Sequence, residues 1–182
     1  SNQDSASDDE TTDEASPSDE ERSDDSELAD TVKELLQEGD SLQETTTSYL
    51  EEGAFEQALK TNDEAQRVYQ DALETATETD LTDTEGIKQK LTAVQNQREE
   101  IHRQRLQARV DSLRSDVSHA VELADDGEFE PAKERLIDLE SPLTSAQEMA
   151  TKHGLYGLQN EIKTIDQRRQ ECINEINNEL SM

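Results

Sequence analysis

Two short stretches, YLEEGAFEQALK at residues 49–60 and LADDGEFEPAKE at residues 123–134, decide the fold that we expect. They align at an offset of 74 residues, with three matched pairs: Gly53 with Gly127, Phe55 with Phe129, and Ala58 with Ala132. Farther along, EGIKQKLTAVQNQREEI at residues 85–101 resembles YGLQNEIKTIDQRRQEC at residues 156–172, at an offset of 71. Helical repeats stack to share a core, so each copy is expected to form helix, Gly-x-Phe turn, helix, loop and helix.

The segments around these turns carry apolar residues three and four positions apart, which is the spacing of one helix face. The low content of glycine (six) and proline (three) in 182 residues also favours helix over sheet. The predicted helices are residues 27–52, 55–77, 83–126, 128–152 and 154–180. The sequence therefore predicts an all-α fold of two tandem three-helix units, residues 27–101 and 102–182, joined by a long shared helix.

The longest predicted helix, residues 83–126, changes the phase of its apolar stripe in the middle. The first apolar seam ends at Ile101, and the second begins at Leu106 after a step of five residues. Residues five apart do not lie on one helix face, so we expect the two halves to face different bundles. A bend near Gln104 is the alternative.

Two polar segments predict helix starts. Ser141 precedes Pro142, and proline is tolerated in the first turn of a helix while serine is a good N-cap. We therefore expect residues 128–152 to divide into two helices that meet at Ser141. The turn TETDLTDTEG at residues 77–86 offers Asp and Thr side chains that can cap the long helix.

The Gly-x-Phe turns resemble those of tetratricopeptide repeats. In that family an aromatic residue or leucine comes four residues before a glycine, an aromatic residue two after it, and an alanine three later. The matching residues are Tyr49, Gly53, Phe55 and Ala58 in the first copy, and Leu123, Gly127, Phe129 and Ala132 in the second. The flanking helices are longer here, and the family's early tryptophan and closing proline are missing. The resemblance implies a protein-binding scaffold, whereas a helical hairpin needs the same Gly-x-aromatic pattern for structural reasons alone.

The first 26 residues, SNQDSASDDETTDEASPSDEERSDDS, contain no large apolar side chain. Such a segment cannot offset the entropy that is lost on ordering, and its like charges keep it extended. We therefore expect residues 1–26 to form a disordered acidic tail. Its simplest role is that of a solvating leader, and an acidic decoy for a basic partner is the alternative.

The net charge of −29 is not confined to that tail. Residues 1–30 carry a net charge of −12, so residues 31–182 still carry −17. Self-repulsion of this size opposes compaction in dilute buffer, but multimolar salt reduces the screening length below about 3 Å. The composition resembles that of haloarchaeal proteins, which implies adaptation to high salt. An ordinary acidic protein with an acidic tail is the alternative.

Basic residues concentrate on the middle of the long helix. Phosphate contacts weaken steeply with salt and the rest of the chain is acidic, which argues against a nucleic-acid site. Pairing with acidic faces of neighbouring helices is the simplest role, and binding of an anionic protein partner is the alternative. The members of this candidate anionic-partner patch are Arg98, His102, Arg103, Arg105, Arg109 and Arg114.

No residue pattern indicates catalysis. His102, His119 and His153 are far apart in the sequence and lack the i, i+4 partner of a helical metal site, so we expect surface histidines and no bound metal. Cys172, the only cysteine, lies on an apolar seam, where thiols are usually inert. The chain also lacks a Gly-x-Ser-x-Gly motif and a glycine-rich phosphate loop. We predict that the chain is not an enzyme and uses no cofactor.

These observations predict a non-catalytic helical-repeat module for protein interaction or scaffolding, adapted to high salt. A structural spacer or accessory arm of a larger polypeptide, and an acidic regulator of a basic or nucleic-acid-binding protein, are the alternatives. A protein partner or self-association is expected, without membrane insertion, because the chain has no run of about 18 apolar residues. The lack of Asn-x-Ser/Thr sites favours a cytoplasmic location, and an anchor or signal upstream of Ser1 is left open.

Overall fold

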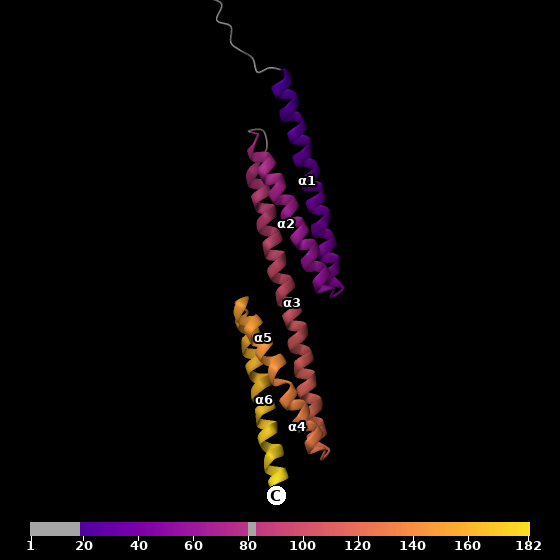
Figure 1. Ribbon diagram of the computed structural model, residues 1–182, viewed down its shortest axis with the longest axis vertical. Coiled ribbons are helices and arrows are strands. Elements are labelled where there is room, and N and C mark those ends of the chain that lie inside the picture. The colour runs from indigo at the N-terminus through magenta and orange to yellow at the C-terminus, as the bar shows by residue number, and fades with distance from the viewer. Residues whose placement is uncertain (1–18, 80–82) are drawn as a thin grey trace, which may run out of the picture.

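The computed structural model describes residues 19–79 and 83–182 of the chain. These residues form helices and connecting turns, without a strand, which confirms the all-α class. The helices shown in Figure 1 are α1 (Asp19–Glu51), α2 (Phe55–Thr77), α3 (Thr84–Asp125), α4 (Phe129–Asp138), α5 (Glu140–Lys152) and α6 (Tyr156–Ser181).

The molecule is a rod made of two bundles placed end to end along α3 (Figure 1). The N-terminal bundle consists of α1, α2 and the first half of α3, and the C-terminal bundle of the second half of α3 with α4, α5 and α6. Apart from α3, no described helix of one bundle comes within 8 Å of a helix of the other, measured between Cα atoms. The long shared helix is therefore the structural link between the two units, as predicted.

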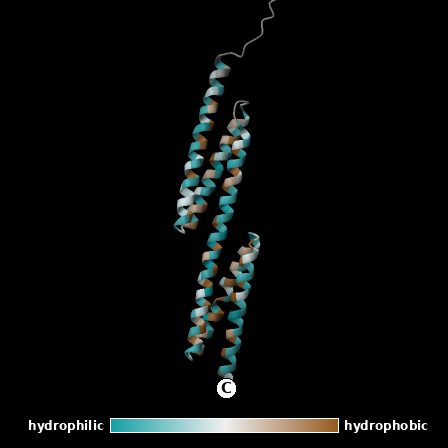
Figure 2. Cartoon of the chain, turned by 180° about the vertical axis from the view of Figure 1, so that it is seen from behind, coloured by the Kyte–Doolittle hydropathy of each residue, from teal (hydrophilic) through white to brown (hydrophobic). Residues whose placement is uncertain are grey.

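The direction in which each bundle lies follows from the apolar stripe of α3. This helix continues through Gln104 without interruption, and its 42 residues span about 63 Å at 1.5 Å per residue. Ile101 and Leu106 are both buried, and the five-residue step between them turns the apolar face by about 140°. The two bundles accordingly lie on different sides of α3 in Figure 1 and in the reverse view of Figure 2.

The two bundles differ in their cores. In the C-terminal bundle, fifteen buried side chains form one continuous cluster, which includes Leu113, Leu136 and Ile162. In the N-terminal bundle, two smaller clusters of four and three buried side chains take its place, one containing Val32 and the other Tyr69. Figure 2 shows the apolar residues in brown along the facing sides of the helices. The C-terminal bundle therefore has the more continuous apolar core.

A few polar side chains are buried in the interior of the N-terminal bundle. The hydroxyl oxygens of Thr46, on α1, and Thr61, on α2, lie 2.7 Å apart. Asn62, which is fully buried, donates from Nδ2 to the Val94 carbonyl of α3 at 3.0 Å. A buried polar group is costly when it is unpaired, so these bonds favour one register of the three helices over shifted ones.

Gly39 and Thr46 occupy small positions on the seam of α1, and both are buried. The ring of Tyr69 on α2 lies directly against Gly39, because a Cβ at that glycine would be 2.4 Å from Tyr69 Cε1. The Tyr69 hydroxyl donates to Asp40 Oδ1 at 2.5 Å, and Lys90 Nζ of α3 donates to the same carboxylate oxygen at 2.7 Å. The glycine thus makes room for an aromatic ring whose hydroxyl shares the Asp40 carboxylate with Lys90, and this carboxylate links all three helices.

The first helix begins earlier than the sequence predicted. α1 starts at Asp19, whereas a helix was expected from about Glu27, after a disordered tail of residues 1–26. Residues 19–26 therefore belong to the helix. Acidic residues such as Glu20 are favourable in a first turn, because they face the positive end of the helix macrodipole. The rest of the predicted tail, residues 1–18, lies outside the described residues.

The break in the fourth predicted helix was placed correctly in outline, but its cap was wrong. α5 begins at Glu140 with Leu139 at its N-cap, and no side chain caps it, whereas Ser141 was expected to do so. Pro142 lies in the first turn of α5, where backbone amides have no carbonyl acceptor within the helix. Proline, which lacks an amide hydrogen, therefore costs no helical hydrogen bond at this position. The helix can therefore begin one residue before the serine.

The predicted cap of the long helix is confirmed. Asp83 is the N-cap of α3, and its Oδ1 accepts a hydrogen bond from the Glu85 amide at 3.0 Å. This bond satisfies one of the amide groups that a helix start leaves unpaired.

Candidate functional site

The two Gly-x-Phe turns share one hydrogen-bonded geometry. Gly53 and Gly127 have φ angles of 72° and 84°, in the left-handed region that glycine enters without strain. The amide after each glycine donates at 2.8 Å to the carbonyl five residues earlier, from Ala54 to Tyr49 and from Glu128 to Leu123. This is the Schellman ending of a helix, which leaves the chain free to reverse.

A third turn of the same kind, which the sequence analysis missed, joins α5 to α6. Gly154 has a φ of 65°, and the Leu155 amide donates to the Ala150 carbonyl at 2.9 Å. Tyr156 follows, so the Gly-x-aromatic pattern occurs again, although this turn is not one of the two aligned hairpins. Helix reversal alone is therefore enough to explain the pattern.

The alanines and phenylalanines of the motif differ in burial. Ala58 and Ala132 are fully buried at the helix contacts. Phe55 and Phe129 are only half-buried. Phe129 packs against the apolar cluster of the C-terminal bundle, whereas Phe55 does not adjoin any of the described clusters. The eight predicted turn residues therefore shape the hairpins, and the two copies contribute unequally to packing.

Four members of the candidate anionic-partner patch form ion pairs within the molecule. Arg98 and Arg105 of α3 reach across to carboxylates of α2, and Arg114 reaches across to α6. Hydrogen bonds from Arg103 and Gln104 lower the pKa of Glu100 to about 2. The pairs are Arg98 with Asp63, Arg103 with Glu100 at 2.6 Å, Arg105 with Glu56 at 3.7 Å, and Arg114 with Glu161 and Asp111 at 2.9 Å each.

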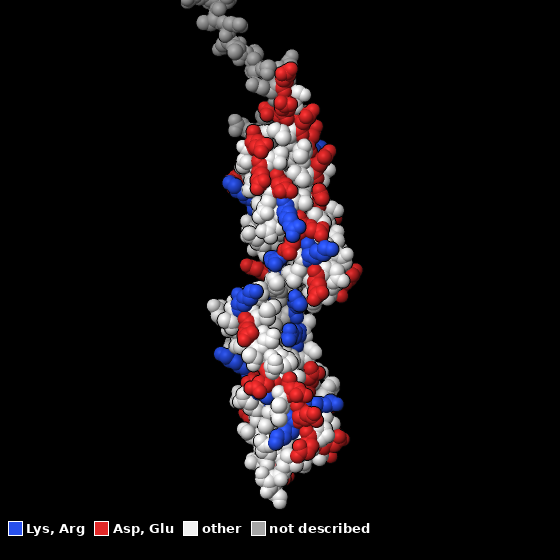
Figure 3. Space-filling model, viewed as in Figure 1, with Lys and Arg blue, Asp and Glu red and all other residues white. Residues whose placement is uncertain are grey.

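The remaining basic residues of the patch, Arg109 and His102, lie on the part of α3 where the two bundles meet. Arg109 is exposed, and it forms no ion pair within the described part of the chain, unlike Arg98, Arg103, Arg105 and Arg114. The α1–α2 turn and the α5–α6 turn approach the same part of α3, residues 98–109, which we call the waist (Figure 1). Figure 3 shows Lys and Arg side chains gathered around this level, between regions where acidic side chains predominate.

The waist also brings together two histidines that are far apart in the sequence. The rings of His102 on α3 and His153, just after α5, stack with centroids 4.2 Å apart and 19° between their planes. Both are half-buried, so the expectation of isolated surface histidines is wrong for this pair. His119 is exposed. Sequence spacing gave no signal for the stack, because the two residues come from different elements.

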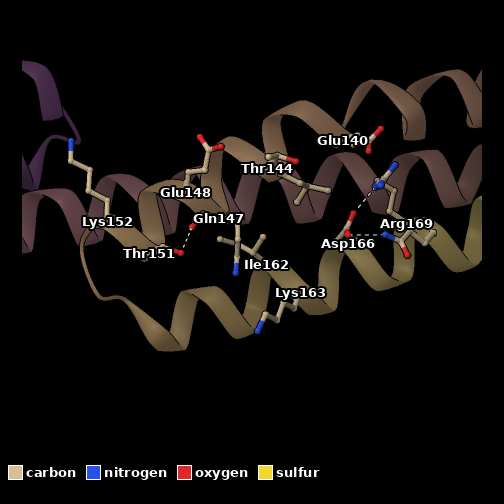
Figure 4. A pocket seen from close by; sticks show the side chains of 12 residues that line it. Glu140, Thr144, Gln147, Glu148, Thr151, Lys152, Ile162, Lys163, Asp166 and Arg169 are labelled. Atoms are coloured by element: carbon tan, nitrogen blue, oxygen red, sulfur yellow. Dashed lines mark hydrogen bonds and ion pairs between the residues drawn. The ribbon is translucent and has the colours of Figure 1, made fainter.

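An open groove runs between α5 and α6, with a volume of about 640 Å³ (Figure 4). Its apolar floor includes Leu143 of α5 and Ile162 of α6, which are both buried. We call it the α5–α6 groove. Its rim carries charges of both signs, from Glu140, Glu148, Lys152, Lys163 and Asp166.

Two polar side chains of the groove have unusual surroundings. Arg169 is only 6% exposed, and it donates from Nε to Asp166 Oδ1 at 2.8 Å and from Nη1 to the Leu136 carbonyl at 3.1 Å. Gln147 Oε1 is buried, and no hydrogen-bond partner is found for it within the described part of the chain. The groove thus combines a fixed charge with an unpaired acceptor.

Metal, thiol and membrane features add no further site among the described residues. Residues 19–79 and 83–182 contain no group of three or more His, Cys, Asp and Glu side chains placed to hold a metal ion. Cys172 is buried, and burial raises the pKa of its thiol. Of the helices described, none combines the length and apolar character that crossing a bilayer requires.

Comparison with known proteins leaves the function to be argued from this geometry. No family model matches the chain, and no match was found among the curated proteins or the solved structures.

Proposed function

We propose that this chain is a non-catalytic scaffold that binds a protein partner through the α5–α6 groove. The observation that carries the proposal is the open groove itself, with Leu143 and Ile162 at its floor and mixed charges at its rim. A groove between two helices accepts the ridge of a third helix, and an apolar floor with a polar rim is the usual composition of a protein-binding surface.

The partner segment that suits this groove is an amphipathic helix. Its apolar side chains, spaced three and four residues apart, would cover Leu143 and Ile162. A donor on its edge would satisfy Gln147 Oε1, whose burial without a hydrogen bond is otherwise unfavourable. Both signs of charge on its flanks would meet the mixed rim.

The composition supports work in concentrated salt, and we place the protein in the cytoplasm of a salt-accumulating cell. Multimolar salt screens the mutual repulsion of the acidic side chains, whose excess gives the chain its charge of −29. Apolar contacts do not depend on charge attraction, so a groove with an apolar floor can retain affinity under these conditions.

The shape of the molecule supports a second candidate function, that of a spacer. The two bundles share only α3, whose 42 residues span about 63 Å, so the helix sets the distance between them. As a spacer arm, the chain would hold other domains apart and would not need an occupied groove.

One capture experiment tests the scaffold proposal. The full chain is immobilised in molar potassium chloride and exposed to nuclease-treated extract of its host, beside a Thr144→Arg variant. Thr144 is exposed on the groove, so the longer charged side chain should block a docking helix without disturbing the core. Thr164→Arg is the matched control, because Thr164 is exposed on α6 and does not line the groove.

The proposal is supported if a protein held by the wild type and by Thr164→Arg is lost with Thr144→Arg, and if its binding segment is an amphipathic helix. Equal capture by all three proteins would reject the groove as the binding site. Absence of any retained protein, together with a monomer in light scattering at the same salt, would favour the spacer.

A further inference from the structure

The stacked histidines join the end of the C-terminal bundle to the middle of the rod. His102 lies on α3 at the waist, and His153 lies in the turn between α5 and α6. Their centroid distance of 4.2 Å is a direct stacking contact. The turn residue Gly154 follows His153 immediately, so the stack holds the tip of the α5–α6 hairpin against α3.

The surroundings of this stack are rich in positive charge. Arg98 and Arg105 lie one helical turn before and after His102 on the same helix face, and Lys152 is adjacent to His153. Of the negative groups near these cations, Asp63 and Glu56 of α2 are paired with Arg98 and Arg105, and Glu99, three residues before His102 on α3, is exposed. A proton added to His102 is therefore repelled by several cations.

The rings also lack hydrogen bonds at their buried nitrogen atoms. His102 Nδ1 and His153 Nε2 are both inaccessible to solvent, and neither has a hydrogen-bond partner among the described residues. A protonated imidazole carries a hydrogen on both nitrogens, so each protonated ring would leave a charged donor buried and unpaired. The stacked arrangement thus suits neutral rings.

We propose that His102 and His153 form a pH-sensitive latch, which holds the α5–α6 turn against α3 when the stacked rings are neutral and releases it when His102 takes up a proton. Release turns the rings toward solvent, where an imidazolium can be hydrated. It needs only the turn and the adjoining helix ends to move, because the apolar cluster of the C-terminal bundle holds the rest.

The direction of the pH dependence follows from the charge on His102. Burial lowers the pKa of His102 below its ordinary value of 6.5, and the charges of His153, Arg98, Arg105 and Lys152 lower it further. A lowered pKa means that the closed state binds the proton less readily than the open state. The closed state is therefore most stable above pH 6.5, and its equilibrium constant for closing falls as the pH drops from there toward the lower pKa, by up to about tenfold per pH unit.

The latch has a consequence for the α5–α6 groove, which rests on the proposed function. Thr151 and Lys152 line the groove and directly precede His153. Opening of the latch would displace this end of α5, so the groove keeps the shape described only above the pH of opening.

The wild-type protein in molar potassium chloride provides the first test, by NMR. Nuclear Overhauser contacts between the ring protons of His102 and His153 should be present at about pH 8 and lost at about pH 5, while helicity by circular dichroism is unchanged. Contacts that persist at the lower pH with His102 protonated would overturn the proposal. Loss of the contacts only together with global unfolding would overturn it as well.

A pair of variants separates the latch from general acid effects. His153→Gln removes the second ring while keeping a polar side chain, and the pKa of His102 should then rise toward 6.5. His119→Gln, at an exposed position on the same helix, should leave the pKa of His102 unchanged. The same pKa of His102 in the wild type and in His153→Gln would show that the two rings are not coupled, which would refute the latch.

Discussion

Replacing Gly39 with alanine should destabilise the N-terminal bundle, although alanine is the better helix former. A Cβ at Gly39 would lie 2.4 Å from Cε1, 2.7 Å from Cζ and 2.8 Å from Cδ1 of Tyr69. Contacts this short cannot persist, so the ring must move. Tyr69 is fully buried, and its hydroxyl is bound to Asp40 at 2.5 Å, so the ring has no free space to enter.

The expected magnitude is a balance of two effects. Overpacking a core costs up to about 3 kcal/mol, and the upper end applies because the obstacle is a buried ring. The gain in helix propensity from glycine to alanine is about 1 kcal/mol. The free energy of unfolding should therefore fall by about 2 kcal/mol, and by more if the hydrogen bond between Tyr69 and Asp40 is lost.

Urea unfolding followed by far-UV circular dichroism in molar potassium chloride measures this change, because urea leaves the ionic strength constant. Gly157→Ala is the matched control, since Gly157 lies in α6 and a Cβ there meets no atom within 4 Å. In a Tyr69→Leu background, Gly39→Ala should become neutral or stabilising by up to about 1 kcal/mol. If Gly39→Ala leaves the wild type as stable as before, the contact between Gly39 and Tyr69 does not constrain the fold and the reasoning fails.

Three further predictions follow from the charges and the packing. On lowering the salt concentration, α1 and α2 should lose amide protection before α6. Residues 27–101 carry nineteen acidic and six basic side chains, a net charge of −13, whereas residues 102–182 carry sixteen acidic and ten basic side chains, a net charge of −6. Full helicity in salt-free buffer would contradict the halophilic interpretation. At high pH, the wild type should lose more stability than Tyr69→Phe. Burial and the bond to Asp40 raise the pKa of Tyr69 above its ordinary 10.0, so the stability that the neutral hydroxyl contributes is complete below pH 10 and is lost above it. Parallel pH profiles of the two proteins in urea unfolding would argue against this expectation. Phe129→Ala should reduce the free energy of unfolding by about 2–3 kcal/mol and Phe55→Ala by about 1 kcal/mol, because both rings are half-buried and only Phe129 packs on a core cluster; equal losses in thermal unfolding would show that the two turns are anchored alike.

The local pattern of the sequence was sufficient for most of the fold. Apolar spacing predicted the helices, and the step from Ile101 to Leu106 predicted that α3 would serve two bundles. These features depend on neighbouring residues along one helix, which a period of 3.6 residues relates directly. The early start of α1 at Asp19 was missed because its first turns lack apolar residues, so no periodicity marks them.

The candidate sites depend on contacts between distant residues, and the sequence predicted them poorly. The stack of His102 on His153 and the contact of Tyr69 with Gly39 both join different helices. Helix periodicity gives the face of each residue but not its partner across the interface. The α5–α6 groove arises from the way two helices pack, so its position could be known only after Leu143 and Ile162 were placed together. The sequence suggested that the arginines pair with acidic faces of neighbouring helices, but it could not give the individual partners, Asp63, Glu56 and Glu161.

The five-residue step from Ile101 to Leu106 in α3 sets the relative orientation of the two bundles, because each bundle packs against its own side of this one helix. Each residue added between Ile101 and Leu106 would rotate the C-terminal bundle by about 100° around the rod and shift it by about 1.5 Å along it. Two surfaces carried by the separate bundles could therefore be set at chosen angles without altering either core. At the waist, the angle between the two bundles is therefore determined by the number of residues between two buried side chains, Ile101 and Leu106.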